Sequence, residues 1–123
     1  MNSELESGAE PPPDPVDWPA LLTSIEGDEV FARELVNAYI ATGSQELAAI
    51  ASALRAGNTV KVRESAHALK GASLNVRASA TTSAASRLEV AANSGEHAQL
   101  PTLAEQLKAS VERTMQYLQS KVT

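Results

Sequence analysis

The sequence predicts an all-α protein, an antiparallel up-and-down four-helix bundle with a short N-terminal helix across one end. Three observations support this fold class. The 123 residues include 22 alanines, which favour packed helices, and only four aromatic side chains. Apolar residues recur at spacings of three and four over several long segments. Connections of two to five residues separate these segments, so consecutive helices must run antiparallel.

Composition divides the chain into two parts. Five of the six prolines lie within the first 19 residues, and the first 16 residues carry four acidic side chains and no basic one. Such a segment buries little apolar surface, so residues 1–16 are predicted to be a disordered acidic and proline-rich tail or linker. A proline-rich ligand motif is disfavoured there because basic anchor residues are missing. Residues 17–123 are predicted to form the bundle domain.

Two helices are predicted before residue 57. Asp17 can cap a short helix that has Pro19 in its first turn and ends at Gly27. Asp28 can cap a second helix that runs until Gly57, with a kink or break expected at Gly43–Ser44. The apolar positions expected along the first part of this helix are Phe31, Leu35, Ala38, Tyr39 and Thr42.

Three further helices follow. Asn58 is a good N-cap for the third, which carries a narrow stripe of small and medium residues. A fourth is expected from about residue 78 to 93, and a fifth from about residue 100 to 122, with Pro101 in its first turn. The stripe of the third helix, which is expected to be buried, consists of Val62, Ala66, Leu69, Ser73 and Val76.

Composition also excludes several classes of protein. The absence of cysteine rules out a disulfide scaffold, a zinc-thiolate site and a cysteine nucleophile. No apolar run approaches the ~18–20 residues of a membrane span, so membrane insertion is not expected. The N-terminus lacks a secretory signal, which makes the cytoplasm the expected compartment. A net charge of −5 argues against nucleic acid as a partner.

The net charge conceals a segregation along the chain. The segment 55–87 has six basic residues and one acidic residue, so its net charge is +5 and that of the remainder is −10. A local basic region on an acidic protein is suited to an acidic partner. This argument requires the basic side chains to share one face of the bundle.

His67 lies on the third helix, rotated away from the buried stripe. Its neighbours three and four positions away include Lys70 and Gly71, with Leu74 one turn further on. A glycine inside a helix costs about 1 kcal/mol relative to alanine, so Gly71 either permits close helix packing or clears an approach to the histidine. A nucleophilic imidazole, a nearby cation and a clear approach are what transient phosphorylation of histidine requires.

These residues carry a family resemblance. The segment His67–Ser73, HALKGAS, resembles the H-x-L-K-G-x-S signature of histidine-containing phosphotransfer (HPt) domains. Gly57–Asn58 resembles the turn before the active-site helix of that family, and Leu88–Glu89 resembles a pair on the following helix. The sequence departs from the family pattern at Arg77, where glycine is frequent, and at Thr81, where leucine is frequent. The resemblance covers roughly residues 18 to 118.

The resemblance implies a phosphorelay intermediate of a two-component system. His67 would accept a phosphoryl group on Nε2 from an aspartyl phosphate of one receiver domain and pass it to an aspartate of another. Lys70 would neutralise the phosphoryl charge, Gly71 would provide clearance, and Glu89 could accept a hydrogen bond from Nδ1–H. Ser73 would serve helix packing. The family implies no nucleotide or metal cofactor, with Mg²⁺ held by the partner receiver.

The expected partners are receiver domains of response regulators, with a hybrid sensor histidine kinase as a further candidate and a monomer as the expected state. Docking of a receiver would combine charge with exposed apolar surface near His67. Which of the apolar candidates are exposed cannot be read from the sequence. The candidate docking residues are Arg63, Leu74, Phe31, Leu35 and Tyr39.

Three alternatives to phosphotransfer differ in how well the sequence fits them. A receiver-binding adaptor without chemistry would use the same basic face, whereas a purely structural bundle would not explain Gly71. An ATP-dependent kinase is disfavoured because the sequence has no nucleotide-binding loop. His97 lies in a predicted loop and is assigned no function, and its spacing from His67 does not fit a metal site.

Overall fold

The computed structural model describes residues 13–123, and all its regular elements are helical. The all-α class is therefore confirmed over these residues. The elements are α2 (Trp18–Ser24), α3 (Glu29–Ala56), α4 (Thr59–Asn75), α5 (Ser79–Ser94), the short 3-10 helix η2 (His97–Gln99) and α6 (Leu100–Val122).

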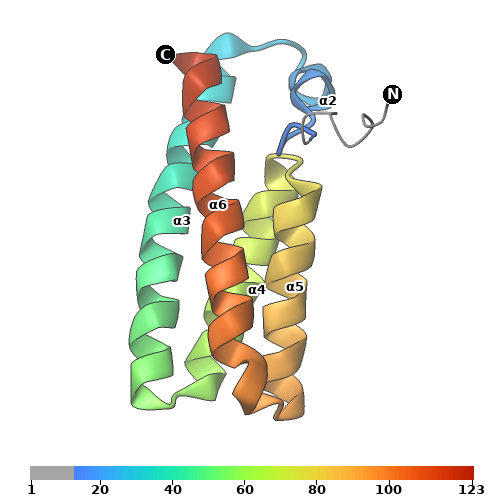
Figure 1. The fold of residues 1–123 in the computed structure, drawn as a ribbon. Coiled ribbons are helices and arrows are strands. Elements are labelled where there is room, and N and C mark those ends of the chain that lie inside the picture. The colour runs from blue at the N-terminus through green and yellow to red at the C-terminus, as the bar shows by residue number, and fades with distance from the viewer. Residues whose placement is uncertain (1–12) are drawn as a thin grey trace, which may run out of the picture.

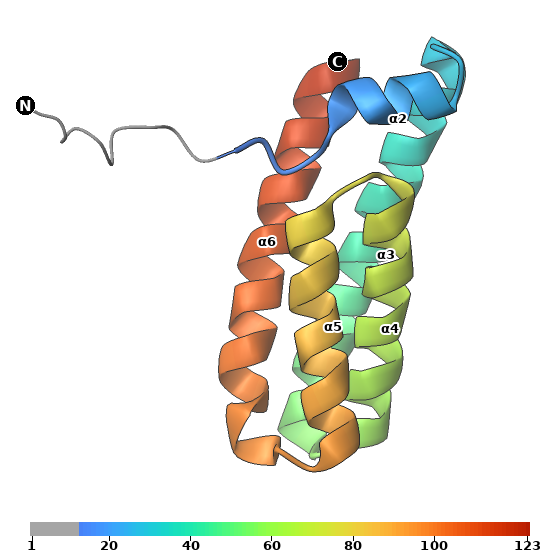
Figure 2. The ribbon, with the colours of Figure 1, turned by 90° about the vertical axis from the view of Figure 1, so that its right-hand side faces the viewer.

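The four long helices α3 to α6 lie side by side (Figure 1). Helix α4 packs against α3 and α5, and α6 packs against the same two helices, so α4 and α6 occupy diagonal positions. Helix α2 lies across one end of this group, above the turn between α4 and α5 (Figure 2). Helices α3 and α5 thus cover two sides of α4, and the side of α4 that faces away from the other helices is exposed.

Side-chain caps start three of the helices as predicted. The carboxylate of Asp17 accepts from the backbone N–H of Ala20 at 3.2 Å, and that of Asp28 accepts from Phe31 at 3.0 Å. The Asn58 side chain accepts from the Lys61 N–H at 3.1 Å. Each cap satisfies a backbone donor that the first helical turn leaves unpaired.

Helix α3 does not break at Gly43, which corrects that part of the sequence prediction. The helix is continuous over 28 residues, and Gly43 is buried in it. A Cβ added at Gly43 would lie 3.2 Å from both Met115 Sδ and Val111 Cγ1 of α6. The glycine therefore allows α3 and α6 to approach closely, which is why it is tolerated inside a helix.

The buried face of α3 also differs from the predicted one. Phe31 remains 43% exposed and Leu35 is half-buried, whereas the neighbouring Ala32 and Val36 are only 2% and 0% exposed. The face is rotated by about one residue because α4 and α6 approach α3 along its small side chains. The larger apolar groups consequently lie at the edge of the core.

The stripe predicted on α4 is confirmed. Val62, Ala66, Leu69 and Ser73 are 0% exposed, and Val76 is 2% exposed. This narrow row of small and medium residues lets α3 and α5 pack closely on either side of α4. It also sets the rotation of α4, and thereby the direction in which His67 points.

The predicted N-terminal tail lies mostly outside the described residues, but its last part can be compared. Val16, which we expected to belong to the tail, is only 2% exposed and joins the core. The next residue, Asp17, donates its backbone N–H to the carbonyl of Arg77 at 3.2 Å, and Arg113 donates to the carbonyl of Pro13. The packed region therefore begins before the boundary at residue 17.

Two pairs of hydroxyl groups join neighbouring helices in the core, close to the turn between α4 and α5. The hydroxyl of Tyr39 on α3 lies 3.1 Å from Ser73 Oγ on α4, and Thr81 Oγ1 on α5 lies 3.0 Å from Thr114 Oγ1 on α6. Burial raises the pKa of Tyr39, opposed by its hydroxyl neighbours. Paired hydroxyls of this kind can be buried without the cost of an unsatisfied polar group. Thr81 thus fits the core despite its departure from leucine.

None of the helices between residues 13 and 123 combines the length and the apolar composition that a membrane span requires.

Candidate phosphotransfer site

His67 projects from the open face of α4, as its position opposite the buried stripe predicts. Its side chain is 66% exposed. The residues directly inward of it on the helix, Ala66 and Leu69, are fully buried and anchor this turn in the core. The imidazole is therefore presented to solvent by a rigid element.

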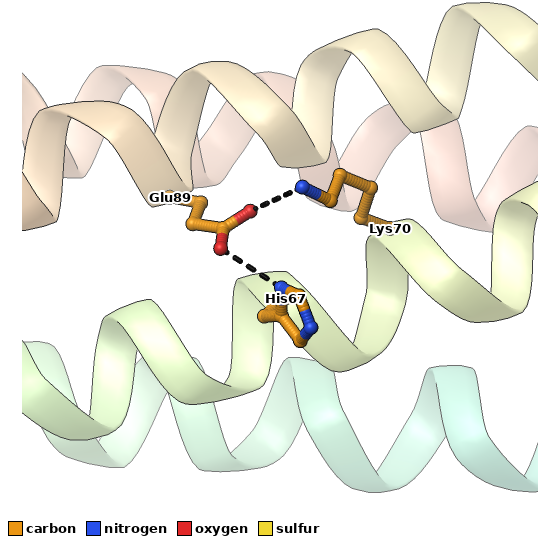
Figure 3. A network of polar contacts seen from close by, with 3 residues as sticks. All are labelled: His67, Lys70 and Glu89. Carbon is orange, nitrogen blue, oxygen red and sulfur yellow. Dashed lines mark hydrogen bonds and ion pairs between the residues drawn. The ribbon is translucent and has the colours of Figure 1, made fainter.

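Glu89 on α5 holds one edge of the imidazole. Its Oε2 lies 2.8 Å from His67 Nδ1 (Figure 3). Because a carboxylate can only accept, Nδ1 carries the proton in the neutral ring, and Nε2 keeps its lone pair. Figure 3 shows Nε2 on the side of the ring that points away from Glu89. The sequence-based role of Glu89 in orienting the ring agrees with this geometry.

Lys70 binds the other oxygen of the same carboxylate. Lys70 Nζ lies 2.9 Å from Glu89 Oε1, so one carboxylate joins the histidine and the lysine (Figure 3). The Lys70 ammonium, and to a lesser degree His67, hold the pKa of Glu89 below its usual range, although partial desolvation acts in the opposite direction. Glu89 is consequently ionised near neutral pH and remains an acceptor for both partners.

Gly71 faces open space. A Cβ added to Gly71 would have no other atom within 4 Å, and the residue is exposed. Close helix packing therefore does not account for this glycine, unlike Gly43. What the missing side chain leaves free is the surface one turn from His67.

Exposed apolar side chains flank the histidine on its own face. Val60 and Leu74 lie two turns before and two turns after His67 on α4, and they are 55% and 58% exposed. The exposed Phe31 lies near the start of α3. Because α3 and α4 are antiparallel, this places Phe31 toward the same end of the helices as Leu74. A narrow groove of about 100 Å³ between α3 and α4 is lined by Leu35, Ala38, Tyr39, Thr42, Ala72, Asn75 and Val76.

Two expectations about the docking surface are corrected. Tyr39 is only 2% exposed and its hydroxyl is paired with Ser73, so it belongs to the core and offers little surface to a partner. The six basic residues of segment 55–87 do not form one patch. Arg87 borders a groove between α5 and α6 that includes no residue of α4, and the charge of Lys70 is shared with Glu89.

The shared carboxylate is the feature of the site that sequence reasoning missed. The sequence predicts that Lys70 neutralises an incoming anion but does not predict its ion pair with Glu89, which depends on the register between α4 and α5. Local spacing carries no signal for that register. Val60 was also missed, although its position two turns before His67 indicates the same face. Within residues 13–123, no three carboxylate or imidazole groups gather in a metal-binding cluster.

Comparison with known proteins agrees with this geometry. The family model described as "Hpt domain" matches residues 34–117. The crystal structure of histidine-containing phosphotransfer protein B from Pseudomonas aeruginosa is similar, with a TM-score of 0.82 and 25% sequence identity over 88% of this chain and 94% of that chain. No curated protein matches the chain. Because the family model covers more than half of the chain and includes His67, Lys70 and Glu89, the chain belongs to the family of Hpt (histidine-containing phosphotransfer) domains.

Proposed function

We propose that this protein is a phosphorelay intermediate in which Nε2 of His67 carries the phosphoryl group between aspartates of two receiver domains. The observation that carries the proposal is the hydrogen bond between Nδ1 and Glu89, which leaves the lone pair of Nε2 unused on a side chain that is largely exposed. We expect a receiver to bind the protein in this fold, a bundle of four long helices with α2 across one end.

Transfer requires an in-line displacement at phosphorus. The Nε2 lone pair attacks the phosphorus of the receiver's aspartyl phosphate, the N–P bond forms, and the aspartate carboxylate leaves with the electrons of the P–O bond. The ring becomes positively charged because Nδ1 keeps its proton. Glu89 Oε2, at 2.8 Å from Nδ1, stabilises that charge without moving. Transfer to a second receiver reverses these steps.

Lys70 has a different task before and after transfer. In the unphosphorylated protein its ammonium binds Glu89 Oε1 at 2.9 Å, on the Nδ1 side of the ring. The phosphoryl group forms on the other side, at Nε2. The flexible side chain of Lys70 must therefore turn so that its ammonium group contacts the phosphoryl oxygens in addition to, or in place of, Glu89. Phosphoryl oxygens bind an ammonium strongly.

The surface around His67 suits a receiver domain. Gly71 leaves room for the receiver's loops, and Leu74 and Phe31 provide exposed apolar contacts, with Leu35 at the groove edge and Arg63 as a charged contact. We propose that the receiver supplies Mg²⁺ and an acidic pocket, and that this chain brings no cofactor. The protein acts as a cytoplasmic, monomeric phosphocarrier without ATP-dependent kinase activity.

A transfer survey tests the proposal. The purified protein is mixed with each receiver domain of the source organism after that receiver has been phosphorylated with a labelled phosphoryl group. Protein that takes up the label is then assayed for an acid-labile, alkali-stable adduct. His67→Gln should abolish labelling, whereas the matched control His97→Gln should not. Label that persists in His67→Gln would refute the assignment. Binding of a receiver without any transfer would favour the adaptor alternative instead.

A further inference from the structure

The residue in left-handed conformation after α4 is not a glycine, unlike the corresponding residues after α3 and α5. The left-handed residues after α3 and α5 are Gly57 and Gly95, with φ of 69° and 81°. The corresponding residue after α4 is Arg77, with φ of 62°. A Cβ in this conformation crowds the following carbonyl, so glycine is the favoured residue there. The helix that carries the histidine is thus followed by a non-glycine residue in a strained backbone conformation.

The fold has no evident need for an arginine at this position. The backbone N–H of Arg77 donates to Leu74 at 3.1 Å and its carbonyl accepts from Asp17 at 3.2 Å. Both bonds would remain with glycine. The side chain is exposed, and it makes no hydrogen bond or ion pair with any residue of the described chain.

One structural benefit of the charge must be separated from a binding role. A cation near the C-terminus of a helix interacts favourably with the helix dipole. That interaction would act on folding stability and would leave the rate of transfer from a receiver unchanged. The two roles can therefore be distinguished by measuring stability and transfer in the same variants.

The position of Arg77 places it at the edge of a receiver footprint centred on His67. Ten residues along an α-helix correspond to about 15 Å. A protein interface of ordinary size covers roughly 800 Å² on each partner, which is a disc of about 16 Å radius. The exposed Leu74 lies between the two residues in the sequence, near the end of α4, and Arg77 follows that helix by two residues. Since Lys70 is occupied by Glu89, Arg77 is a cation that the site leaves available.

We propose that Arg77 is a docking residue whose guanidinium contacts acidic side chains of the receiver domain and contributes to the choice of receiver. This inference rests on the proposed function, because the partner is the receiver that exchanges phosphoryl groups with His67. A charge at the rim of an interface acts mainly on the rate of association and on its salt dependence. Arg77 should therefore affect encounter with the receiver and leave the chemical step unchanged.

The test compares Arg77→Asn, Arg77→Gly and Arg77→Lys with wild type, using the receiver that labels the wild-type protein fastest. Asparagine and glycine tolerate the left-handed conformation without charge, whereas lysine keeps the charge. We expect kcat/KM for transfer to fall about threefold to tenfold in Arg77→Asn and Arg77→Gly at low salt. The loss should shrink to less than about twofold near 0.5 M salt. Arg77→Lys should retain most of the rate.

Two controls make the result specific. Lys108→Gln removes an exposed charge from α6, diagonally opposite α4, and should leave kcat/KM unchanged. Labelling of His67 by phosphoramidate, a small donor that needs no docking, should be equal in all Arg77 variants. Thermal unfolding should show Arg77→Gly to be at least as stable as wild type, because the backbone strain is relieved.

The proposal is overturned if Arg77→Asn and Arg77→Gly keep the wild-type kcat/KM at low salt. It is equally overturned if they lose phosphoramidate labelling, because the effect would then lie at the histidine or in folding. Failure of the wild-type protein to accept a phosphoryl group from any receiver would instead refute the proposed function. The two failures are therefore distinguishable.

Discussion

Glu89 on α5 accepts a hydrogen bond from Nδ1 of His67 on α4 at 2.8 Å, so the tautomer of the histidine is set by a neighbouring helix. The nucleophilic atom and the group that orients it are separated by 22 residues of sequence. Any change that shifts α4 along α5 would break this bond. The packing of the two helices is thereby part of the site.

Replacing Glu89 should separate its orienting role from its charge. Glu89→Ala removes the acceptor for Nδ1–H, so transfer should slow by about tenfold or more, as when the hydrogen-bond partner that orients a metal-binding histidine is removed. Glu89→Gln retains a carbonyl oxygen for Nδ1–H and removes the negative charge that binds Lys70. The phosphorylated form of Glu89→Gln should therefore persist longer, because Lys70 is free to bind the phosphoryl group.

Phosphohistidine half-lives and initial rates of transfer, measured by gel separation of the phosphorylated form, check both expectations. Glu105→Gln, a change of the same kind on α6, serves as the matched control. Wild-type rates in Glu89→Ala would contradict the orienting role.

The lowered pKa of Glu89 predicts how its contribution to stability depends on pH. A carboxyl group whose pKa is lower in the folded state stabilises the fold above its unfolded pKa, near 4.5, and this stabilisation is lost as the pH falls through the lower folded value. The difference in unfolding free energy between wild type and Glu89→Gln should be constant from pH 6 to 8, at about 1 kcal/mol or less. It should shrink toward zero below about pH 4.

Urea unfolding at several pH values measures this difference directly. A difference that grows on acidification would show that the sign is wrong. Between pH 5 and 8 the ionisation of Glu89 should not shape the pH profile of transfer.

Substitution of Gly71 should separate stability from access. Gly71→Ala should stabilise the protein by up to about 1 kcal/mol, because the added Cβ meets no other atom within 4 Å and alanine is the better helix former. Gly71→Leu should also fold, but its side chain would occupy the surface near His67 and slow transfer from a receiver severalfold. Phosphoramidate labelling should be much less affected. Equal transfer rates in the two variants would exclude a steric role for this position.

Gly43 provides the opposite case within the same protein. Its added Cβ would lie 3.2 Å from Met115 Sδ and Val111 Cγ1, so Gly43→Leu should overpack the contact between α3 and α6. A loss of about 1–3 kcal/mol in unfolding free energy is expected, as for other overpacked cores. Urea unfolding beside Gly71→Leu makes the comparison. Equal stability of the two leucine variants would contradict the close approach of these helices.

Much of the fold can be predicted from local signals in the sequence. The errors of the prediction arise where packing between helices decides the structure. Asp17, Asp28 and Asn58 each mark a helix start through a side chain that bonds three residues ahead, which is information contained in the local sequence. The stripe on α4 has one possible orientation, so the outward direction of His67 was predictable. On α3 two stripes one residue apart compete, and the neighbouring helices select the one with smaller residues.

The same distinction applies to the site. Lys70 lies three residues from His67, so its proximity could be predicted from helix geometry alone. Its ion pair with Glu89 depends on where α5 sits against α4, which involves the packing of both helices. The motif resemblance identified Glu89, but no property of residue 89 itself distinguishes it from the other acidic side chains.

The shared carboxylate has a consequence for product release. With His67 neutral, the charges of Lys70 and Glu89 cancel, so the resting site presents no net charge to the acidic pocket of a receiver. A phosphoryl group on Nε2 makes this surface anionic. The complex formed before transfer is then replaced by one in which a phosphohistidine faces the acidic pocket of the receiver, and the repulsion that Mg²⁺ in the pocket leaves unneutralised should hasten separation. A weaker Kd for the dephosphorylated receiver after phosphorylation of His67 would record it. The charge that favours dissociation arrives with the phosphoryl group itself, so release of the receiver requires no conformational change of this protein.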